Sequence, residues 1–197
     1  MAAHPNVEVR CEDILAFPWA QHPGCRVVGA MPYLLTSPIL VMLAERPVPI
    51  ADAWLGMQRE VADRLTARPG TKAYGRLTIL VQYRFTVEQV LRMGRQAFFP
   101  PPAVGSAWVH LTPRPPAAAV EDERVFFDVV RAAFSQRRKT LLNCLGQLTG
   151  VRVSREQAQQ ALEAAGLPAG VRGEALSLEE FARLANVMSR REQSVIQ

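Results

Sequence analysis

The chain has 197 residues, 49% of them hydrophobic and 21% charged, a composition that suits one packed domain with a small appendage. No run of 18 apolar residues predicts a membrane span, and the N-terminus lacks the basic segment and apolar core of a signal peptide. The three cysteines are too scattered for a disulfide framework, and neither they nor the three histidines have metal-ligand spacing, so we expect no metal and a reduced, cytoplasmic setting. The net charge of +5 is compatible with a partner that carries phosphates.

The first predicted strand covers residues 6–13, where Val7, Val9 and Cys11 alternate with polar residues. Asp13 stands at the end of this strand. A carboxylate in this place can accept hydrogen bonds from an amino group of a bound ligand, but an aspartate after a strand more often caps a turn or a helix. Both interpretations of Asp13 stay open on the residues alone.

Residues 26–40 predict a strand, a sharp turn and a helix. The strand is the apolar segment at residues 26–28, and the helix is expected to begin at Thr36-Ser37-Pro38, since Ser or Thr before a proline favours a helix start. The turn carries Tyr33 at the carboxyl end of the strand, which is where open parallel sheets bind ligands. The alternative is a tyrosine that packs in the core.

The next segments repeat the order of strand and helix. Residues 53–57 predict a strand, and a helix follows from Gln58 with Val61 and Leu65 on one face. The loop at residues 67–78 and its entry are basic, so they either contact backbone phosphates or form a solvated loop. The basic residues are Arg64, Arg68, Lys72 and Arg76.

A proline-rich loop follows two further regular segments at residues 77–83 and 86–93. Phe98 lies just before three consecutive prolines, which make this loop rigid and extended. After the loop, residues 106–111 alternate between apolar and polar types and predict an edge or closing strand. On the residues alone, Phe98 is best interpreted as a core side chain.

The pattern becomes helical after a linker at residues 113–119. Phe126 and Val130 recur at the spacing of one helix face, and a basic cluster follows at residues 136–139. Two capping boxes predict the starts of two more helices. These boxes are Ser154 with Gln157 and Ser177 with Glu180.

Six stretches, in the same order along the chain, resemble the ribosomal RNA adenine dimethylase family, whose members use S-adenosylmethionine. The stretches are G-A-M-P-Y with T-S-P-I-L, Q-R-E-V-A-D-R-L, A-Y-G-R-L-T, F-F-P-P-P-A-V-G-S-A, Q-R-R-K-T-L and L-S-L-E-E-F-A-R-L-A-N. The resemblance implies an α/β fold. Residues 1–113 would be the C-terminal part of a Rossmann-like methyltransferase sheet, without its first strands and glycine-rich cofactor loop. Residues 117–197 would be a small all-helical domain.

The same resemblance implies roles for particular residues. Asp13 matches the aspartate that contacts the adenine of S-adenosylmethionine, and Ala30 occupies the position of a motif asparagine that serves both cofactor and catalysis. Pro32 matches the proline whose backbone carbonyl accepts a hydrogen bond from the target amine. Tyr33 matches the tyrosine that stacks on the target base, and Phe98 matches the phenylalanine that helps to hold that base.

The chain also departs from the family pattern. Alanine cannot accept a hydrogen bond through its side chain, and one such positioned group contributes roughly 3–4 kcal/mol to a transition state. In addition, Ala103 and Gly105 replace a lysine and an aspartate, and no glycine-rich cofactor loop follows a strand. The main hypothesis is an enzyme that methylates adenines of small-subunit rRNA with S-adenosylmethionine. The alternative is a catalytically inactive or truncated relative that only binds rRNA or the ribosomal subunit, and a third possibility is an incompletely folded product of a truncated gene.

The expected partners follow from the same hypotheses. The residues expected to contact RNA are Arg76, Arg137, Arg138 and Lys139. A sheet that lacks its first strands exposes an unpaired edge, which favours self-association.

Overall fold

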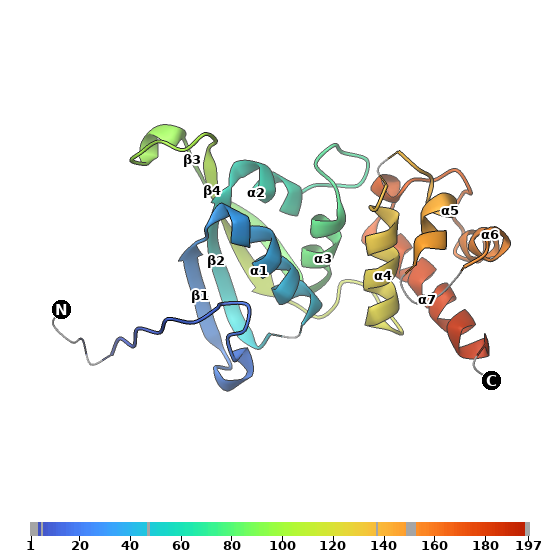
Figure 1. Ribbon diagram of the computed structural model, residues 1–197, viewed down its shortest axis with the longest axis horizontal. Helices are drawn as coiled ribbons and strands as arrows, with labels where there is room; N and C mark the ends of the chain where they lie inside the picture. Colours follow the sequence, from blue (N-terminus) through green and yellow to red (C-terminus); the bar gives the residue numbers. More distant parts are fainter. Residues whose placement is uncertain (1–3, 5, 47, 137, 149–152, 196–197) are drawn as a thin grey trace.

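The computed structural model describes residues 4, 6–46, 48–136, 138–148 and 153–195. Figure 1 shows two parts of the molecule: a mixed sheet with three helices packed on it, and a cluster of helices beside them. In the ranges given, no helix is both long and apolar enough to cross a membrane.

The sheet has four strands in the order β1-β2-β4-β3. β1 (Cys25–Ala30) is parallel to β2 (Ile50–Gln58), and β4 (Ser106–Pro113) is antiparallel to both β2 and β3 (Phe85–Met93). The strands predicted around residues 26–28 and 53–57 are therefore confirmed. β4 is an interior strand rather than an edge strand, because β3 folds back beside it and forms the edge.

The register brings several strand ends to one edge of the sheet. Ala30 pairs with Gly56 at the carboxyl end of β1, and Ser106 at the start of β4 pairs with both Gln58 of β2 and Met93 of β3. Residues that follow β1, β2 and β3 therefore emerge close together, and we call this the carboxyl edge.

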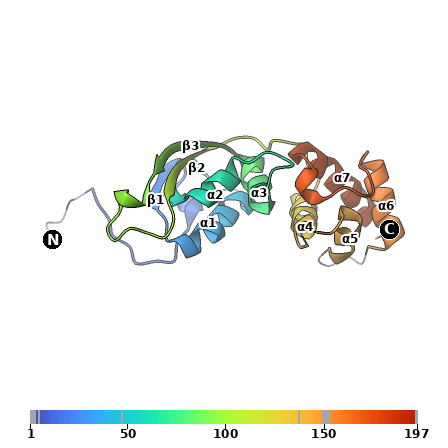
Figure 2. The ribbon, with the colours of Figure 1, turned by 90° about the horizontal axis from the view of Figure 1, so that it is seen from above.

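Three helices cover one face of the sheet, as Figure 2 shows from above. They are α1 (Tyr33–Glu45), α2 (Arg59–Leu65) and α3 (Arg76–Arg84). Alternate residues of β2 and β4 point into this layer and are buried, because successive side chains of a strand face opposite sides. These buried residues are Ala53, Leu55, Met57, Ala107, Val109 and Leu111.

The second part of the molecule is helical. Its helices are α4 (Glu123–Ala133), α5 (Leu141–Cys144), α6 (Arg155–Ala164) and α7 (Leu178–Val195), and the short turns of the chain are η1 (Trp19–Gln21), η2 (Arg95–Ala97), η3 (Leu145–Gln147) and η4 (Gly173–Ala175). The predicted face of α4 is confirmed, since Phe126 and Val130 are fully buried. Both predicted capping boxes are formed, at the start of α6 and at the start of α7.

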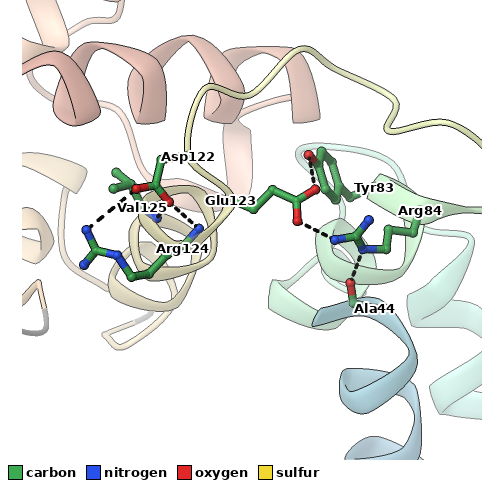
Figure 3. A network of polar contacts seen from close by, with 7 residues as sticks. All are labelled: Ala44, Tyr83, Arg84, Asp122, Glu123, Arg124 and Val125. Atoms are coloured by element: carbon green, nitrogen blue, oxygen red, sulfur yellow. Dashed lines mark hydrogen bonds and ion pairs between the residues drawn. The ribbon is translucent and has the colours of Figure 1, made fainter. Parts of the chain in front are cut away.

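A polar junction joins α3 to α4 (Figure 3). The Glu123 carboxylate accepts hydrogen bonds from the Tyr83 hydroxyl at 3.0 Å and from the Arg84 guanidinium, and Arg84 Nε donates to the Ala44 carbonyl at 2.7 Å. Asp122 caps α4 by accepting from the backbone amides of Arg124 and Val125. Burial beside Glu123 raises the pKa of Tyr83 to about 12, so the phenol stays protonated and keeps donating at neutral pH.

The predicted strand at residues 6–13 is wrong. These residues have no strand assignment, and Val9 is 90% exposed. Alternation makes a segment compatible with a strand, but a strand forms only where its backbone finds a partner. The described sheet offers this segment none.

The helix after β1 begins earlier than predicted. α1 starts at Tyr33, and Pro38 lies inside it. The Pro32 carbonyl accepts hydrogen bonds from the Leu35 amide at 2.9 Å and from the Thr36 hydroxyl at 3.3 Å, which closes a first turn before Thr36. Pro38 is the sixth residue of α1, so it removes the hydrogen bond that its amide would give to the Leu34 carbonyl, and Leu34 is 91% exposed to solvent.

Candidate functional site

Three segments meet at the carboxyl edge and are tied together through the backbone. The Met31 amide donates to the Gly56 carbonyl at 3.0 Å, which fixes the turn after β1 against β2. The Arg59 amide donates to the Gly105 carbonyl at 2.9 Å, which fixes the start of α2 against the loop at residues 94–105. The turn after β1, the start of α2 and this loop therefore form one continuous rim.

Tyr33 is the aromatic residue at the centre of this rim. It is the first residue of α1, and the residue remains 41% exposed. Its hydroxyl shares a hydrogen bond of 3.2 Å with Oγ of Ser106, a buried serine at the start of β4. This bond holds the tip of the side chain while part of the ring stays open to solvent, so the ring is positioned to stack on a planar ligand.

The backbone beside Tyr33 offers a carbonyl acceptor, but at a different residue from the one expected. A carbonyl oxygen has two lone pairs, and both acceptor positions of Pro32 are used by Leu35 and Thr36. The Met31 carbonyl accepts no hydrogen bond from the residues that the structure describes. Ala30, at the end of β1, is exposed and contributes no polar side chain.

The loop at residues 94–105 adds further aromatic surface to the rim. Phe98 is partly exposed and Phe99 is fully exposed, so neither is a core side chain. The loop leaves the sheet at Met93 and returns at Ser106, and Arg95 Nε donates to the Pro102 carbonyl at 2.7 Å across it. In Figure 1 the loop projects beyond the ends of the strands.

Asp13 lies in an exposed turn before β1. Its Oδ1 accepts a hydrogen bond from the Leu15 amide at 3.0 Å, and its carbonyl accepts from the Ala16 amide. The turn-capping interpretation of this residue is therefore confirmed. The second carboxylate oxygen has no partner among the described residues and is open to a ligand.

The predicted RNA-contacting cations differ in how free they are. Arg76 begins α3, and its Nη2 lies 3.0 Å from Oε1 of Glu45 on α1, so the guanidinium is partly neutralised. It lines a cavity of about 400 Å³ together with Arg64 and Phe134. Arg138 and Lys139 are exposed in the turn between α4 and α5, whereas Arg137 lies outside the described residues.

Comparison with known proteins identifies the family. A model of the ribosomal RNA adenine dimethylase family matches residues 1–190. The ribosomal RNA small subunit methyltransferase A of Geobacillus thermodenitrificans is 45% identical over 198 residues, which cover 95% of this chain and 68% of that protein. The chain belongs to the ribosomal RNA adenine dimethylase family. A second relative in this dimethylase family, the protein of the same name from Streptococcus pneumoniae, is 47% identical over 193 residues, covering 93% of this chain and 67% of that protein.

Solved structures show the fold that this family member shares. A dimethyladenosine transferase from Plasmodium falciparum superposes with a TM-score of 0.72 at 24% identity, covering 96% of this chain and 74% of that one. The 23S rRNA methyltransferase ErmE superposes with a TM-score of 0.62 at 28% identity, covering 94% of this chain and 73% of that one. The predicted α/β class with a Rossmann-like sheet is therefore confirmed.

Two features of this dimethylase were missed by sequence reasoning. The first is Ser106, which anchors Tyr33 from 73 residues away in the chain. The second is a polar cluster on the uncovered face of the sheet, where Asp52 accepts from Arg26 Nε at 2.7 Å and Trp54 Nε1 at 3.2 Å. His110 Nε2 lies 3.1 Å from the same carboxylate, and its ring stacks on Trp54 with centroids 4.1 Å apart. No local pattern predicts either feature, because Ser106, Arg26 and His110 lie on other elements than the residues that they contact.

Proposed function

We propose that this chain transfers methyl groups from S-adenosylmethionine to the exocyclic amine of adenines in small-subunit rRNA. Its family membership and its similarity to ribosomal RNA small subunit methyltransferases support this proposal. The observation that carries it in the structure is Tyr33, an aromatic ring that is anchored at its tip, partly open, and placed at the carboxyl edge beside a backbone carbonyl. We also propose that the chain works in the cytoplasm, which is compatible with a ribosomal RNA substrate.

The chemistry explains why such a ring is needed. The lone pair of the adenine amine is delocalised into the base, so the amine is a poor nucleophile. The base must leave its stack to reach an active site. It must then be held flat against aromatic side chains, with its amine hydrogen-bonded so that the lone pair turns toward the methyl donor.

The residues of this chain supply the side of the site that holds the base. We propose that Tyr33 stacks on the target adenine and that Phe98 contributes a second aromatic contact from the loop. We assign the acceptor for the amine to the Met31 carbonyl, because the Pro32 carbonyl already accepts two hydrogen bonds in α1. The role of Pro32 is then to begin the helix and to fix the turn, since its ring restricts the backbone.

When bound, S-adenosylmethionine would supply an electrophilic methyl group on its sulfonium centre. Two residues of this chain fit a role toward it. The free carboxylate oxygen of Asp13 can accept from an amino group, and the small side chain of Ala30 leaves the end of β1 open to close approach. Alanine gives no hydrogen bond to hold the ligand, so we expect this position to bind more weakly than an asparagine would.

Two further parts of the proposal concern assembly. We propose that residues 1–113 and 117–197 act as separate domains, the second of which presents Arg138 and Lys139 to RNA. We also propose that the chain self-associates through β1, which has only one strand partner, β2, in the described sheet. An unpaired strand edge is a ready template for pairing with a second copy.

The experiment is methyl transfer to small-subunit rRNA. The purified chain is incubated with this RNA and with S-adenosylmethionine labelled in its methyl group, and the nucleosides are separated and weighed by mass spectrometry. Labelled N6,N6-dimethyladenosine is the expected product. Binding of the RNA without any labelled adenosine would instead support the relative that only binds rRNA.

A further inference from the structure

A second cavity lies next to the rim, between α2 and the loop at residues 94–105. Its volume is about 630 Å³. Three arginines line it together with two carboxylates, and glycines form part of its wall. The charged residues are Arg59, Arg92 and Arg95 with Glu60 and Asp63, and the glycines are Gly94 and Gly105.

The pairing of these charges leaves the cavity cationic. Asp63 Oδ1 lies 3.4 Å from Nη2 of Arg92, and Glu60 Oε1 lies 2.5 Å from Nη2 of Arg64, which comes from the next turn of α2. Both carboxylates are therefore compensated. Arg59 has no side-chain partner among the residues that the structure describes.

The place of the cavity connects it to the site for the target base. Gly105 lines the cavity, and the next residue, Ser106, holds the Tyr33 hydroxyl. The Arg59 amide donates to the Gly105 carbonyl, so the Arg59 side chain also leaves the backbone beside Gly105. A β-carbon at position 105 would lie 3.2 Å from the Met93 carbonyl oxygen, so the wall is tightly packed on this side.

We propose that this cavity binds a backbone phosphate of the RNA strand next to the target adenine, with Arg59 as the main contact and Arg92 as the second. This inference rests on the proposed function. A guanidinium matches a phosphate with two parallel hydrogen bonds, which fix orientation as well as supply charge. Phosphate contacts set the position of a strand without reading its sequence. A base taken out of its stack needs such a fixed point on its own backbone.

The experiment measures RNA affinity as a function of salt. Fluorescence anisotropy with a labelled fragment of small-subunit rRNA gives Kd between about 50 and 200 mM salt for the wild type, Arg59→Gln and Arg155→Gln. Arg155 is an exposed arginine at the start of α6 with one neutral partner, Asn143, and serves as the matched control. Thermal melting of each variant checks that folding is unchanged.

We expect Arg59→Gln to lose roughly tenfold in RNA affinity at low salt. The slope of log Kd against log salt should also become smaller by about 0.7–0.9, which is the contribution of one phosphate contact. Arg155→Gln keeps the wild-type slope. An unchanged slope for Arg59→Gln, with the wild type binding normally, overturns the phosphate site and leaves the proposed function standing. A wild type that binds no RNA overturns the proposed function and this site together.

A second arm separates an RNA phosphate from free phosphate. Inorganic phosphate is titrated into the wild type and into Arg59→Gln by calorimetry. No saturable heat at millimolar phosphate supports a site that needs the RNA strand. Saturable binding that disappears in Arg59→Gln, together with an unchanged RNA slope, would assign the cavity to a free anion and overturn the proposal.

Discussion

The two faces of the four-stranded sheet use alternate residues of the same strands but differ in what covers them. Under α1, α2 and α3, the side chains of β2 and β4 are fully buried, with Leu55 and Leu111 as examples. On the opposite face Val28 is 64% exposed and Leu91 is 52% exposed, and with Trp54 and Trp108 they line a shallow apolar cavity. Stability therefore comes from the covered face, whereas the open face presents apolar and aromatic surface to solvent.

The open face is nevertheless ordered by a specific cluster. Asp52 is buried and joins β1 to β2 and β4 through Arg26, Trp54 and His110. The hydrogen bond from Arg26 is the largest cause that lowers the pKa of Asp52, to about 2. The covered face is therefore stabilised by apolar packing, whereas the open face is ordered by the Asp52 carboxylate and its hydrogen-bond donors.

The largest effect is expected on the covered face. Leu111→Ala removes a fully buried side chain and leaves a cavity, so it should lower the free energy of unfolding by about 2–5 kcal/mol. Leu91→Ala on the open face should lower it by less than about 1 kcal/mol, because half of that side chain already contacts water. Urea unfolding of both variants measures the difference. Equal losses would show that the open face is covered in solution.

The next effect concerns catalysis at the end of β1. Ala30 is exposed and has room for a longer side chain, so Ala30→Asn should restore a hydrogen-bond acceptor beside the amine. One positioned group of this kind is worth roughly a hundredfold or more in kcat. The measurement is the rate of methyl transfer to small-subunit rRNA, with Ala51→Asn, at the exposed start of β2, as the control. An unchanged rate would show that position 30 does not limit the reaction.

A smaller effect is expected from pH on the open face. The pKa of Asp52 is lower in the folded chain than its usual value, so its stabilising contribution is fully present above about pH 4 and is lost as the pH falls toward about 2. Asp52→Asn removes this dependence. The free energy of unfolding should therefore fall more steeply between pH 5 and pH 2 for the wild type than for the variant. The same pH dependence in both proteins would contradict the assignment.

The smallest effect concerns self-association. Val28 is a large exposed apolar residue on β1, one of the two edge strands of the described sheet. Val28→Lys should weaken association, because a charge on an edge strand opposes pairing with a second copy. Sedimentation velocity over a range of concentrations gives the mass of each species. A wild type that stays monomeric at the highest concentration would exclude association through β1.

Local patterns predicted the parts of this fold that depend on local interactions. The buried face of α4 and both capping boxes follow from residues within a few positions of one another. The strands around residues 26–28 and 53–57 were also predicted correctly, because β1 and β2 find partners in the sheet. The predicted strand at residues 6–13 failed because a strand also needs a distant partner. The start of α1 was misplaced for a different, local reason, since the Thr36 hydroxyl donates to the Pro32 carbonyl and the helix begins before the Ser-Pro pair.

The candidate site shows the same division. Tyr33 and Phe98 could be selected from the sequence because each stands beside a conspicuous turn or proline run. Ser106 and Arg59 could not, because their roles depend on the register of β4 with β2 and on the packing of α2 against the loop. The Met31 carbonyl could not be selected either, because the two hydrogen bonds that occupy its neighbour, the Pro32 carbonyl, depend on where α1 begins.

The central claim is that the Tyr33 ring holds the target base, and the most direct measurement compares two substitutions. Methyl transfer to small-subunit rRNA is measured for Tyr33→Phe and Tyr33→Ala under the same conditions. Phenylalanine keeps the aromatic face and loses only the bond to Ser106, so we expect kcat within about tenfold of the wild type. Alanine removes a stacking partner worth about 1–3 kcal/mol per base, so we expect a further loss of about tenfold to a hundredfold. Equal activity of the two variants would contradict the claim that stacking on Tyr33 positions the adenine.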